Sequence, residues 1–362
     1  MSQAISTLVD TLRVTHHLDG DAYAALLTCG DDEAESLRRQ AREVAQQVFG
    51  HAIFVRGLVE LTNVCRNDCL YCGIRRSNTA VSRYTLTREQ VMASCGQGYR
   101  LGFRTFVLQG GELPRARAQW VADIVADIRS TWPDCAITLS LGEWPREAYA
   151  LWRQAGADRY LLRHETHNAL HYACLHPSEM SQANRLQCLD HLKALGYQVG
   201  TGIMVGSPGQ TVAHLVEDIQ YIEPLRPHLV GLGPFVPQHD TPLGHHPQGS
   251  ADLTTRLYAI FRLMMPHALI PSTTALNTIH PQGRLLGIQA GANVVMPNLS
   301  PPDMRAHYAL YDGKAATAAE AAEGIEQLET QLATIGYHID WSRGDYRNDN
   351  ESLVTQNKAS KA

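Results

Sequence analysis

The chain alternates between short apolar segments rich in β-forming residues and longer segments with helical spacing of apolar residues, and this alternation constrains its fold most. The expected strands are residues 54–61, 105–109, 136–141, 159–163, 198–205, 229–234, 269–274 and 293–297. The expected helices are residues 87–101, 116–131, 145–156, 182–196, 212–224, 253–265 and 281–291. Because strands that alternate with helices form parallel β/α units, the pattern predicts an α/β fold, a closed (β/α)8 barrel of the TIM type.

An open, doubly wound sheet is the alternative arrangement of the same units. It is disfavoured because no G-x-G-x-x-G sequence follows the first expected strand. We expect the barrel to occupy residues 51–312, after an N-terminal helical segment over residues 1–50. A helix within residues 313–342 is expected to close the barrel, and the polar residues 343–362 are expected to form a disordered tail.

Three cysteines, Cys65, Cys69 and Cys72, form a C-x-x-x-C-x-x-C sequence directly after the first expected strand. In a β/α barrel this position lies at the C-terminal face, where active sites are found. Zinc is the ordinary alternative, but a structural zinc site takes four ligands and no second cysteine pair is nearby. Three thiolates instead fit an iron–sulfur cluster with one iron left open. The other five of the eight cysteines are scattered, which is typical of small buried apolar residues.

A cysteine sequence of this kind at this position is the hallmark of the radical S-adenosylmethionine (SAM) superfamily, which the chain resembles. Residues 109–112, Gln-Gly-Gly-Glu, follow the second expected strand and resemble the superfamily's segment that holds the SAM amino group. The glycine at Gly111 lets the backbone approach a ligand closely, and Glu112 can accept a hydrogen bond from an ammonium group. The ring of Tyr71, just before the last cysteine, can pack against the cluster or a cofactor ring.

Longer segments resemble the HydE family of [FeFe]-hydrogenase maturases within this superfamily. They are residues 140–147, 159–166, 204–211, 233–235, 240–243 and 273–275. The resemblance covers residues 50–312 and implies a radical SAM enzyme with a [4Fe–4S] cluster on Cys65, Cys69 and Cys72. The implied SAM contacts are Ser140, Glu165 and Arg185. The implied substrate-side pocket inside the barrel comprises Arg163, Thr273, Thr274, Tyr308 and Tyr311.

The charged residues of this set also have a structural interpretation. Arg163 and Glu165 stand on either side of His164 where a strand ends, so both should face the barrel lumen. There they could form an ion pair that stabilises the barrel mouth, because a buried charge must be matched. A structural pair and a binding role are both compatible with this pattern.

The threonines and tyrosines have structural interpretations as well. Thr273 and Thr274 could reflect ordinary β-propensity, and neighbours on a strand face opposite sides. Tyr308 and Tyr311 are three residues apart and could form one face of a helix packed on the core. These alternatives stay open at the level of sequence.

The resemblance also implies the cofactors and partners. Some HydE proteins carry further cysteines near the C-terminus for a second cluster, but this chain has no cysteine after Cys188, so one [4Fe–4S] cluster and SAM are expected. The implied substrate is a small cysteine-bound iron carbonyl–cyanide complex supplied by another hydrogenase maturase, which would be a transient partner. The implied reductant is flavodoxin or ferredoxin.

Two other functions remain possible. A methylornithine synthase or biotin synthase-like radical SAM enzyme shares the barrel and the cysteines but acts on a small organic molecule. A non-catalytic iron–sulfur carrier or scaffold would keep the cysteines without SAM-binding residues. A net charge of -5 without a basic stripe disfavours a nucleic-acid partner. With neither a signal peptide nor an apolar segment long enough to span a membrane, we expect a cytoplasmic protein.

Overall fold

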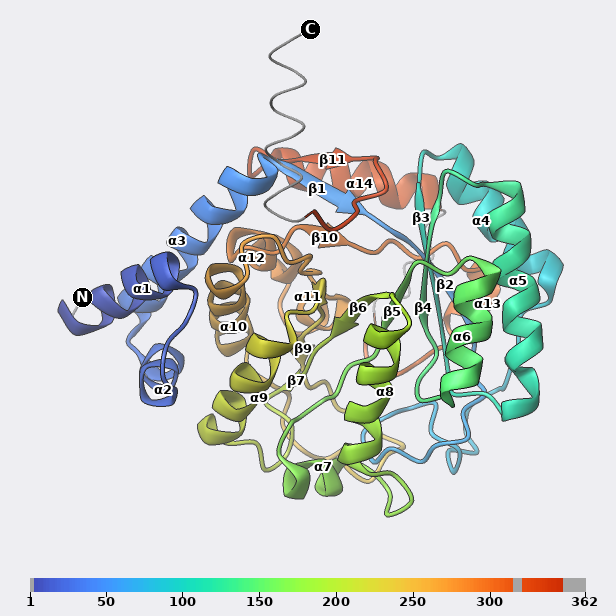
Figure 1. Cartoon of the computed structure of the whole chain (residues 1–362), viewed down its shortest axis with the longest axis horizontal. Helices are drawn as coiled ribbons and strands as arrows, with labels where there is room; N and C mark the ends of the chain where they lie inside the picture. The colour runs from blue at the N-terminus through green and yellow to red at the C-terminus, as the bar shows by residue number, and fades with distance from the viewer. Residues whose placement is uncertain (1–2, 315–320, 348–362) are drawn as a thin grey trace, which may run out of the picture.

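Six parallel strands form the main part of the barrel wall, in the order β2-β3-β4-β5-β6-β8. The structure is a computed structural model that describes residues 3–314 and 321–347. The six strands are β2 (Gly57–Thr62), β3 (Thr105–Gly110), β4 (Ala136–Ser140), β5 (Arg159–Leu161), β6 (Gln198–Thr201) and β8 (Leu229–Val230). Their carboxyl ends point the same way, so the residues that follow each strand meet at one end of the barrel (Figure 1).

Single backbone bridges close the barrel between β8 and β2. Leu229 pairs with Leu269, Pro271 pairs with Val294 of β10 (Val294–Val295), and Asn298 pairs with Leu58, all in parallel. The segments at Leu269 and Asn298 thus take the seventh and eighth strand positions, and the predicted (β/α)8 barrel is confirmed. The expected strand over residues 269–274 contributes only bridges, because Pro271 has no N–H to donate and a helix begins at Thr274.

Two short sheets extend the wall at its two ends. β1 (Ala52–Val55) pairs with β10 and with β11 (His338–Asp340). β7 (Met204–Val205) pairs with β9 (Gly233–Pro234). Three expected strands are therefore each divided into two: residues 54–61 into β1 and β2, 198–205 into β6 and β7, and 229–234 into β8 and β9.

Helices surround the strands on the outside (Figure 1). The expected ones are α4 (Arg88–Arg100), α5 (Ala118–Thr131), α6 (Arg146–Ala155), α8 (Gln182–Ala194), α9 (Val212–Leu225), α10 (Ala251–Met264) and α12 (Gly283–Gln289). Four short helices were not expected: η1 (Arg115–Arg117), α7 (Ala169–Leu175), α11 (Thr274–Ile279) and α13 (Pro302–Arg305). Among the described residues, no helix is long and apolar enough to cross a membrane.

The N-terminal segment is helical, as expected for residues 1–50, of which residues 3–50 are described. It contains α1 (Gln3–Thr15), α2 (Gly20–Thr28) and α3 (Asp31–Phe49). Gly50 ends α3 with a φ of 64° while its N–H bonds to the carbonyl of Gln46, a conformation that favours glycine. Apolar side chains of α3, among them Leu37 and Ala41, share one core with α10.

The C-terminal segment packs against the closed end of the barrel, which is the end at the amino termini of the strands. α14 (Ala321–Ala333) covers part of the expected closing helix, while residues 315–320 lie outside the described residues. β11 follows α14 and was not expected, because its partner β1 is distant in sequence.

The start of the expected disordered tail is ordered. Arg159, buried at the closed end, donates to the carbonyl oxygen of Arg343 over 3.0 Å and pairs with Asp345. Arg56 donates to the carbonyl of Gly344 over 3.3 Å. The prediction of disorder is wrong for residues 343–347, because two buried guanidinium groups need acceptors that this polar segment supplies. Residues after 347 lie outside the described part of the chain.

Candidate active site

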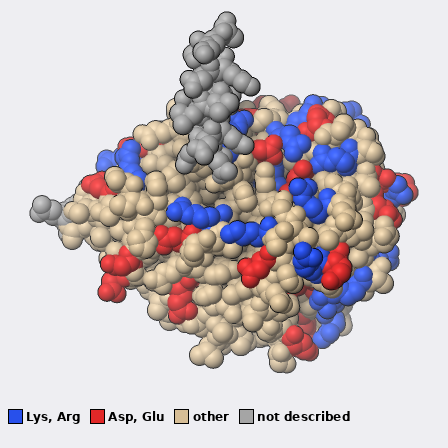
Figure 2. Space-filling model, viewed as in Figure 1, with Lys and Arg blue, Asp and Glu red and all other residues tan. Residues whose placement is uncertain are grey.

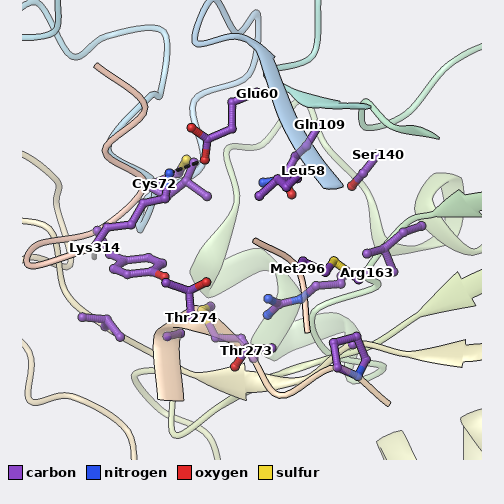
Figure 3. Close-up of a pocket in the computed structure, with 18 of the residues that line it drawn as sticks. Leu58, Glu60, Cys72, Gln109, Ser140, Arg163, Thr273, Thr274, Met296 and Lys314 are labelled. Carbon is purple, nitrogen blue, oxygen red and sulfur yellow. Dashed lines mark hydrogen bonds and ion pairs between the residues drawn. The ribbon is translucent and has the colours of Figure 1, made fainter. Parts of the chain in front are cut away.

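A cavity of about 380 Å³ lies inside the barrel toward the carboxyl ends of the strands. Most of the predicted site residues line it: Tyr71, Cys72, Ser140, Arg163, Glu165, Arg185, Thr273, Thr274, Tyr308 and Tyr311. Figure 3 shows Cys72 and Ser140 on one side of this space, with Arg163 and the two threonines on the other. Cys65, Cys69, Gly111 and Glu112 are not part of the lining.

The cysteine loop begins where β2 ends and is fixed by backbone contacts to its neighbours. The N–H of Arg66 donates to the carbonyl of Glu112 over 2.8 Å, and the N–H of Leu70 donates to the carbonyl of Leu175 over 2.9 Å. The N–H of Glu112 points at Sγ of Cys65, 3.4 Å away. The loop is therefore held by the segments after β3 and in α7, independently of any ligand.

The three cysteine sulfurs lie close enough to affect one another. Burial raises the pKa of Cys69 well above its usual value, and the neighbouring Cys72 and Cys65 raise it further. Burial and Cys65 raise the pKa of Cys72 to about 12. Thiolates gathered in a buried place need positive charge to balance them, and bound iron supplies it. The donor set thus suits a metal centre.

The spacing of the donors favours a cluster over a single ion. Within the described ranges, no three His, Cys, Asp or Glu side chains converge on one point as a single metal ion requires. In an iron–sulfur cluster each cysteine binds a different iron, so the sulfurs stand farther apart. Three thiolates without a fourth protein ligand fit a cluster with one open iron.

Gly111 and Glu112 support the cysteine loop. A Cβ atom on Gly111 would lie 2.4 Å from the carbonyl oxygen of Val64 and 2.9 Å from Cβ of Cys65, so only glycine lets the two loops meet. The Glu112 carboxylate is 3 % exposed. Its Oε1 accepts from Nε of Arg66 over 2.7 Å, and its Oε2 accepts from Nδ2 of Asn67 over 2.9 Å and from the N–H of Glu143 over 2.8 Å.

With both oxygens occupied by protein donors, Glu112 is placed to orient the cysteine loop. Its predicted direct contact with an ammonium group stays a prediction. The backbone of Gly110, one residue before Gly111, does line the cavity.

Arg163 and Glu165 face the cavity together, as expected, and form an ion pair with an Nη2–Oε2 distance of 2.7 Å. Arg163 also donates to the carbonyl of Ile203 over 3.0 Å. Glu165 has a φ of 68°, in the left-handed region that non-glycine residues avoid. His164 points the other way into the core, where it contacts Thr201 and Asp218, and has a structural role.

Arg185 of α8 brings a fixed positive charge to the cavity wall. It pairs with Glu143, and its Nη1 donates to the carbonyl of Arg163 over 2.7 Å. Burial alone would lower the pKa of Arg185, but Tyr172 and Glu143 raise it well above its usual value. Glu143 was not assigned a role from the sequence. The available signal was its position just after β4, like that of Glu112 after β3.

Thr273 and Thr274 both line the cavity, which two neighbours on a strand would not do. Thr273 is the N-cap of α11 and accepts from the N–H of Leu276, and Thr274 is the first helical residue. The expected strand position was therefore wrong, and helix geometry explains why both residues face the same space. Neither Tyr308 nor Tyr311 lies in a helix, so the packed-helix interpretation of these two was also wrong.

Glu60 and Lys314 are cavity residues that the sequence analysis missed. Glu60 on β2 is fully buried, and its Oε1 pairs with Nζ of Lys314, as the dashed line in Figure 3 shows. Nζ of Lys314 lies 4.5 Å from the ring centre of Tyr308. The signal was a charged residue two positions after Leu58, at an inward position of an otherwise apolar strand.

Tyr71 anchors the cysteine loop through an aromatic contact. Its ring meets His176 edge-on at 5.5 Å, and its hydroxyl lies 3.3 Å from Nε2 of that histidine. Burial, followed by the charge of Arg185, lowers the pKa of His176 to about 3. The neutral ring can therefore accept from Tyr71 while its Nδ1–H donates to the carbonyl of Tyr172, 3.0 Å away.

Comparison with known proteins identifies the family. Residues 59–222 match the family model for the radical SAM superfamily. The chain is 45% identical over 280 residues to the [FeFe] hydrogenase maturase subunit HydE of Thermotoga maritima, covering 77% of this chain and 80% of that protein. The chain belongs to the HydE family. It is a radical SAM enzyme, and its family implies a [4Fe–4S] cluster and SAM. The alternative of a non-catalytic iron–sulfur carrier or scaffold is therefore disfavoured.

More distant relatives share the architecture. 3-Methylornithine synthase of Methanosarcina acetivorans is 27% identical over 279 residues, which is 76% of this chain and 78% of that protein. The crystal structure of methylornithine synthase (PylB) has a TM-score of 0.80 at 24% identity and covers 92% of this chain and 97% of that chain. HydG, a maturase of the [FeFe]-hydrogenase, has a TM-score of 0.80 at 20% identity, over 96% of this chain and 78% of that chain. At these identities the two structures show the fold alone.

Proposed function

We propose that this protein matures the [FeFe]-hydrogenase active site by acting on a small cysteine-bound iron carbonyl–cyanide precursor. The observation that carries the proposal is the shared cavity, which joins the innermost cysteine, Cys72, to a polar wall around Arg163. A radical made next to a cluster needs its target within the same water-excluded space. Membership of the HydE family supports the [FeFe]-hydrogenase as the enzyme whose active site is matured.

In this proposal Cys65, Cys69 and Cys72 would hold one [4Fe–4S] cluster, and Ser140, Glu165 and Arg185 would hold SAM beside it. When bound, the cluster and SAM supply a one-electron cleavage that yields methionine and a 5′-deoxyadenosyl radical. Arg185 stays charged and offers donors to a carboxylate, while Glu165 offers acceptor oxygens. The absence of cysteines after Cys188 supports a single cluster.

The opposite wall suits a polar, anionic substrate. Arg163 carries a positive charge, and its Nε atom has no hydrogen-bond partner among the described residues. Burial raises the pKa of Tyr311 to about 12, so its hydroxyl stays protonated and can donate. Thr273 and Thr274 add two hydroxyl groups. We further propose that another maturase supplies the substrate, that flavodoxin or ferredoxin supplies the electron, and that the enzyme works in the cytoplasm.

Reductive SAM cleavage tests the cofactor assignment. Reconstituted protein with dithionite and SAM should release 5′-deoxyadenosine and should contain about four irons per chain. Cys69→Ser should abolish the release, while Cys29→Ser, next to the N-terminal helix α2, should leave it unchanged. An iron content near twice that value, or equal release by the Cys69 variant, would contradict the assignment.

A methylornithine synthase-like activity is the second candidate, because the relatives in that group align with most of this chain. Such an enzyme would act on a small organic molecule such as lysine. Incubation with lysine, SAM and reductant should therefore give no methylornithine. Its formation would replace the maturase proposal while leaving the radical SAM assignment intact.

A further inference from the structure

Exposed arginines gather around the outside of the cysteine loop. Arg66 and Arg76 belong to that loop, Arg115 and Arg117 follow β3, and Arg146 opens α6; all five are exposed, and we call them the basic rim. Figure 2 shows Lys and Arg side chains over the right side of the molecule, with Asp and Glu among them; some lie at the lower right, where Figure 1 places the lower ends of α5 and α6. The three segments that carry the rim all lie at the carboxyl ends of the strands.

The rim contrasts with the chain as a whole, whose net charge is -5. Glu143 is buried and paired with Arg185, and Glu112 is buried and paired with Arg66 of the rim, with Arg115 nearby. The excess positive charge of the rim therefore comes from Arg76, Arg117 and Arg146. Glu147 beside Arg146 and Asp123 of α5 are exposed acids that follow β4 and β3. Within the described residues, Arg117 forms no ion pair, so its charge is available to a partner. The rim therefore creates a local positive field on an acidic protein.

The rim lies directly over one of the cluster cysteines. Sγ of Cys65 receives the N–H of Glu112 at 3.4 Å. The carboxylate of that same Glu112 pairs with Arg66, and Nη2 of Arg115 lies 3.8 Å from it. One residue thus separates the cysteine sulfur from the exposed arginines. A protein bound at the rim would lie near the cluster without entering the cavity.

A groove of about 410 Å³ adjoins the rim and gives it a shape that a partner can fit. Arg115, Trp144 and Arg146 line one part of it, and Asn184 and His191 of α8 line another. The guanidinium of Arg115 lies over the ring of Trp144, 4.9 Å from its centre, which holds this charge in place. Asn184 of the groove donates to the carboxylate of Glu143, the partner of Arg185 in the cavity.

We propose that the basic rim is the docking surface for a small acidic one-electron carrier protein that reduces the cluster; this inference rests on the proposed function. In the transfer, one electron leaves the reduced flavin or iron–sulfur centre of the carrier and enters the cluster, and no bond is made or broken. Positive and negative surfaces steer two such proteins together and orient them. None of the five rim arginines lines the cavity to which the proposed function assigns SAM and the substrate.

The test compares a rim variant with a matched variant at the other end of the barrel. Arg117→Glu combined with Arg146→Glu reverses two rim charges without touching Glu112 or the cavity. Arg100→Glu reverses an exposed charge at the end of α4. The rate of cluster reduction by photoreduced flavodoxin is followed by stopped-flow absorbance at low ionic strength, with dithionite in parallel.

The rim variant should be reduced by flavodoxin at least about tenfold more slowly than the wild type, while Arg100→Glu stays close to it. Added salt should slow the reduction of the wild type by flavodoxin and have little effect on the rate for the rim variant, because the Debye length falls to about 10 Å at 0.1 M. Dithionite-driven SAM cleavage should be equal in all three proteins. If the wild type does not cleave SAM with dithionite, that result would contradict the proposed function and not the proposed docking surface.

Two results would overturn the docking proposal. An unchanged flavodoxin rate in the rim variant would show that the rim is not used. An equal loss in Arg100→Glu would show that overall charge, and no particular surface, governs the encounter. A rim variant with Gln in place of both arginines should fall between the wild type and the charge reversal, as an electrostatic effect requires.

Discussion

The two ends of the barrel bury similar charges and use them differently. At the closed end, Arg159 donates to Thr105 and to the carbonyl of Arg343 and pairs with Asp345, and it faces away from the main cavity. At the open end, Arg163 and Arg185 also have partners in the chain, yet both still line the cavity. Burial of a charge therefore does not mark a functional site by itself. A charge that is held by the fold and still faces a cavity does.

Breaking the buried pair at the open end should have the largest effect. Arg185→Met removes the partner of Glu143, whose side chain is 6% exposed, and leaves a buried carboxylate without a cation. We expect the free energy of unfolding to fall by about 3–5 kcal/mol. Lys193→Met, at an exposed position of the same helix α8, should change it by less than about 0.5 kcal/mol. Anaerobic urea unfolding of the cluster-loaded proteins measures both, and equal losses would argue against a role for the buried pair.

Substitutions of Glu165, which has a strained backbone, should affect SAM binding and protein stability differently. Glu165→Asn and Glu165→Gln both lose the ion pair with Arg163, but asparagine tolerates the left-handed backbone better, so the Asn variant should be more stable than the Gln variant by part of a strain of about 1–3 kcal/mol. SAM affinity should nevertheless fall about tenfold or more, because a hydrogen bond to a charged group is lost. Equilibrium binding of SAM and urea unfolding check the two effects. Glu165→Gln is the control, which keeps the side-chain length and the strain but loses the charge.

Much of the architecture could be predicted because it depends on patterns among residues that are close together in the sequence. The β/α alternation predicted the barrel, and the position of Cys65, Cys69 and Cys72 directly after the first expected strand placed them at the end of β2. Arg163 and Glu165 could be placed on one side because strand periodicity continues to the strand end.

Features that depend on distant pairs could not be predicted from local patterns. Glu60 and Lys314 are 254 residues apart in sequence, and neither alone indicates the other. Residues 343–347 look disordered by composition and are ordered by buried arginines elsewhere in the chain. Thr273 has β-propensity, yet the chain uses its hydroxyl as a helix cap.

The closed end should tolerate the loss of a charge better than the open end. Asp345→Asn removes the carboxylate that pairs with Arg159, but the carboxylate is 37% exposed and the arginine keeps its carbonyl and hydroxyl acceptors. We expect a loss of about 1 kcal/mol in the free energy of unfolding. SAM cleavage should be unchanged. A tenfold loss of SAM cleavage would show that the closed end affects the open end and would contradict the distinction between them.

A pH dependence is also expected at the open end, and it is absent at neutral pH. Burial and Arg185 lower the pKa of His176 to about 3 from its usual 6.5. Below pH 6.5, His176 therefore binds a proton in the unfolded chain but not in the folded chain. The free energy of unfolding should fall as the pH drops from 6.5. This histidine contributes up to about 1.4 kcal/mol per pH unit. His176→Gln should make the unfolding free energy less dependent on pH between 6.5 and 5, and an unchanged slope would contradict the assignment.

The most direct measurement of the central claim is complementation. The gene is expressed in a host that makes an [FeFe]-hydrogenase and its other maturases but lacks its own HydE, and hydrogen evolution is measured. The account predicts that the wild type restores hydrogen evolution and that Cys69→Ser does not. No restoration by a wild-type protein that still cleaves SAM would contradict the maturase function.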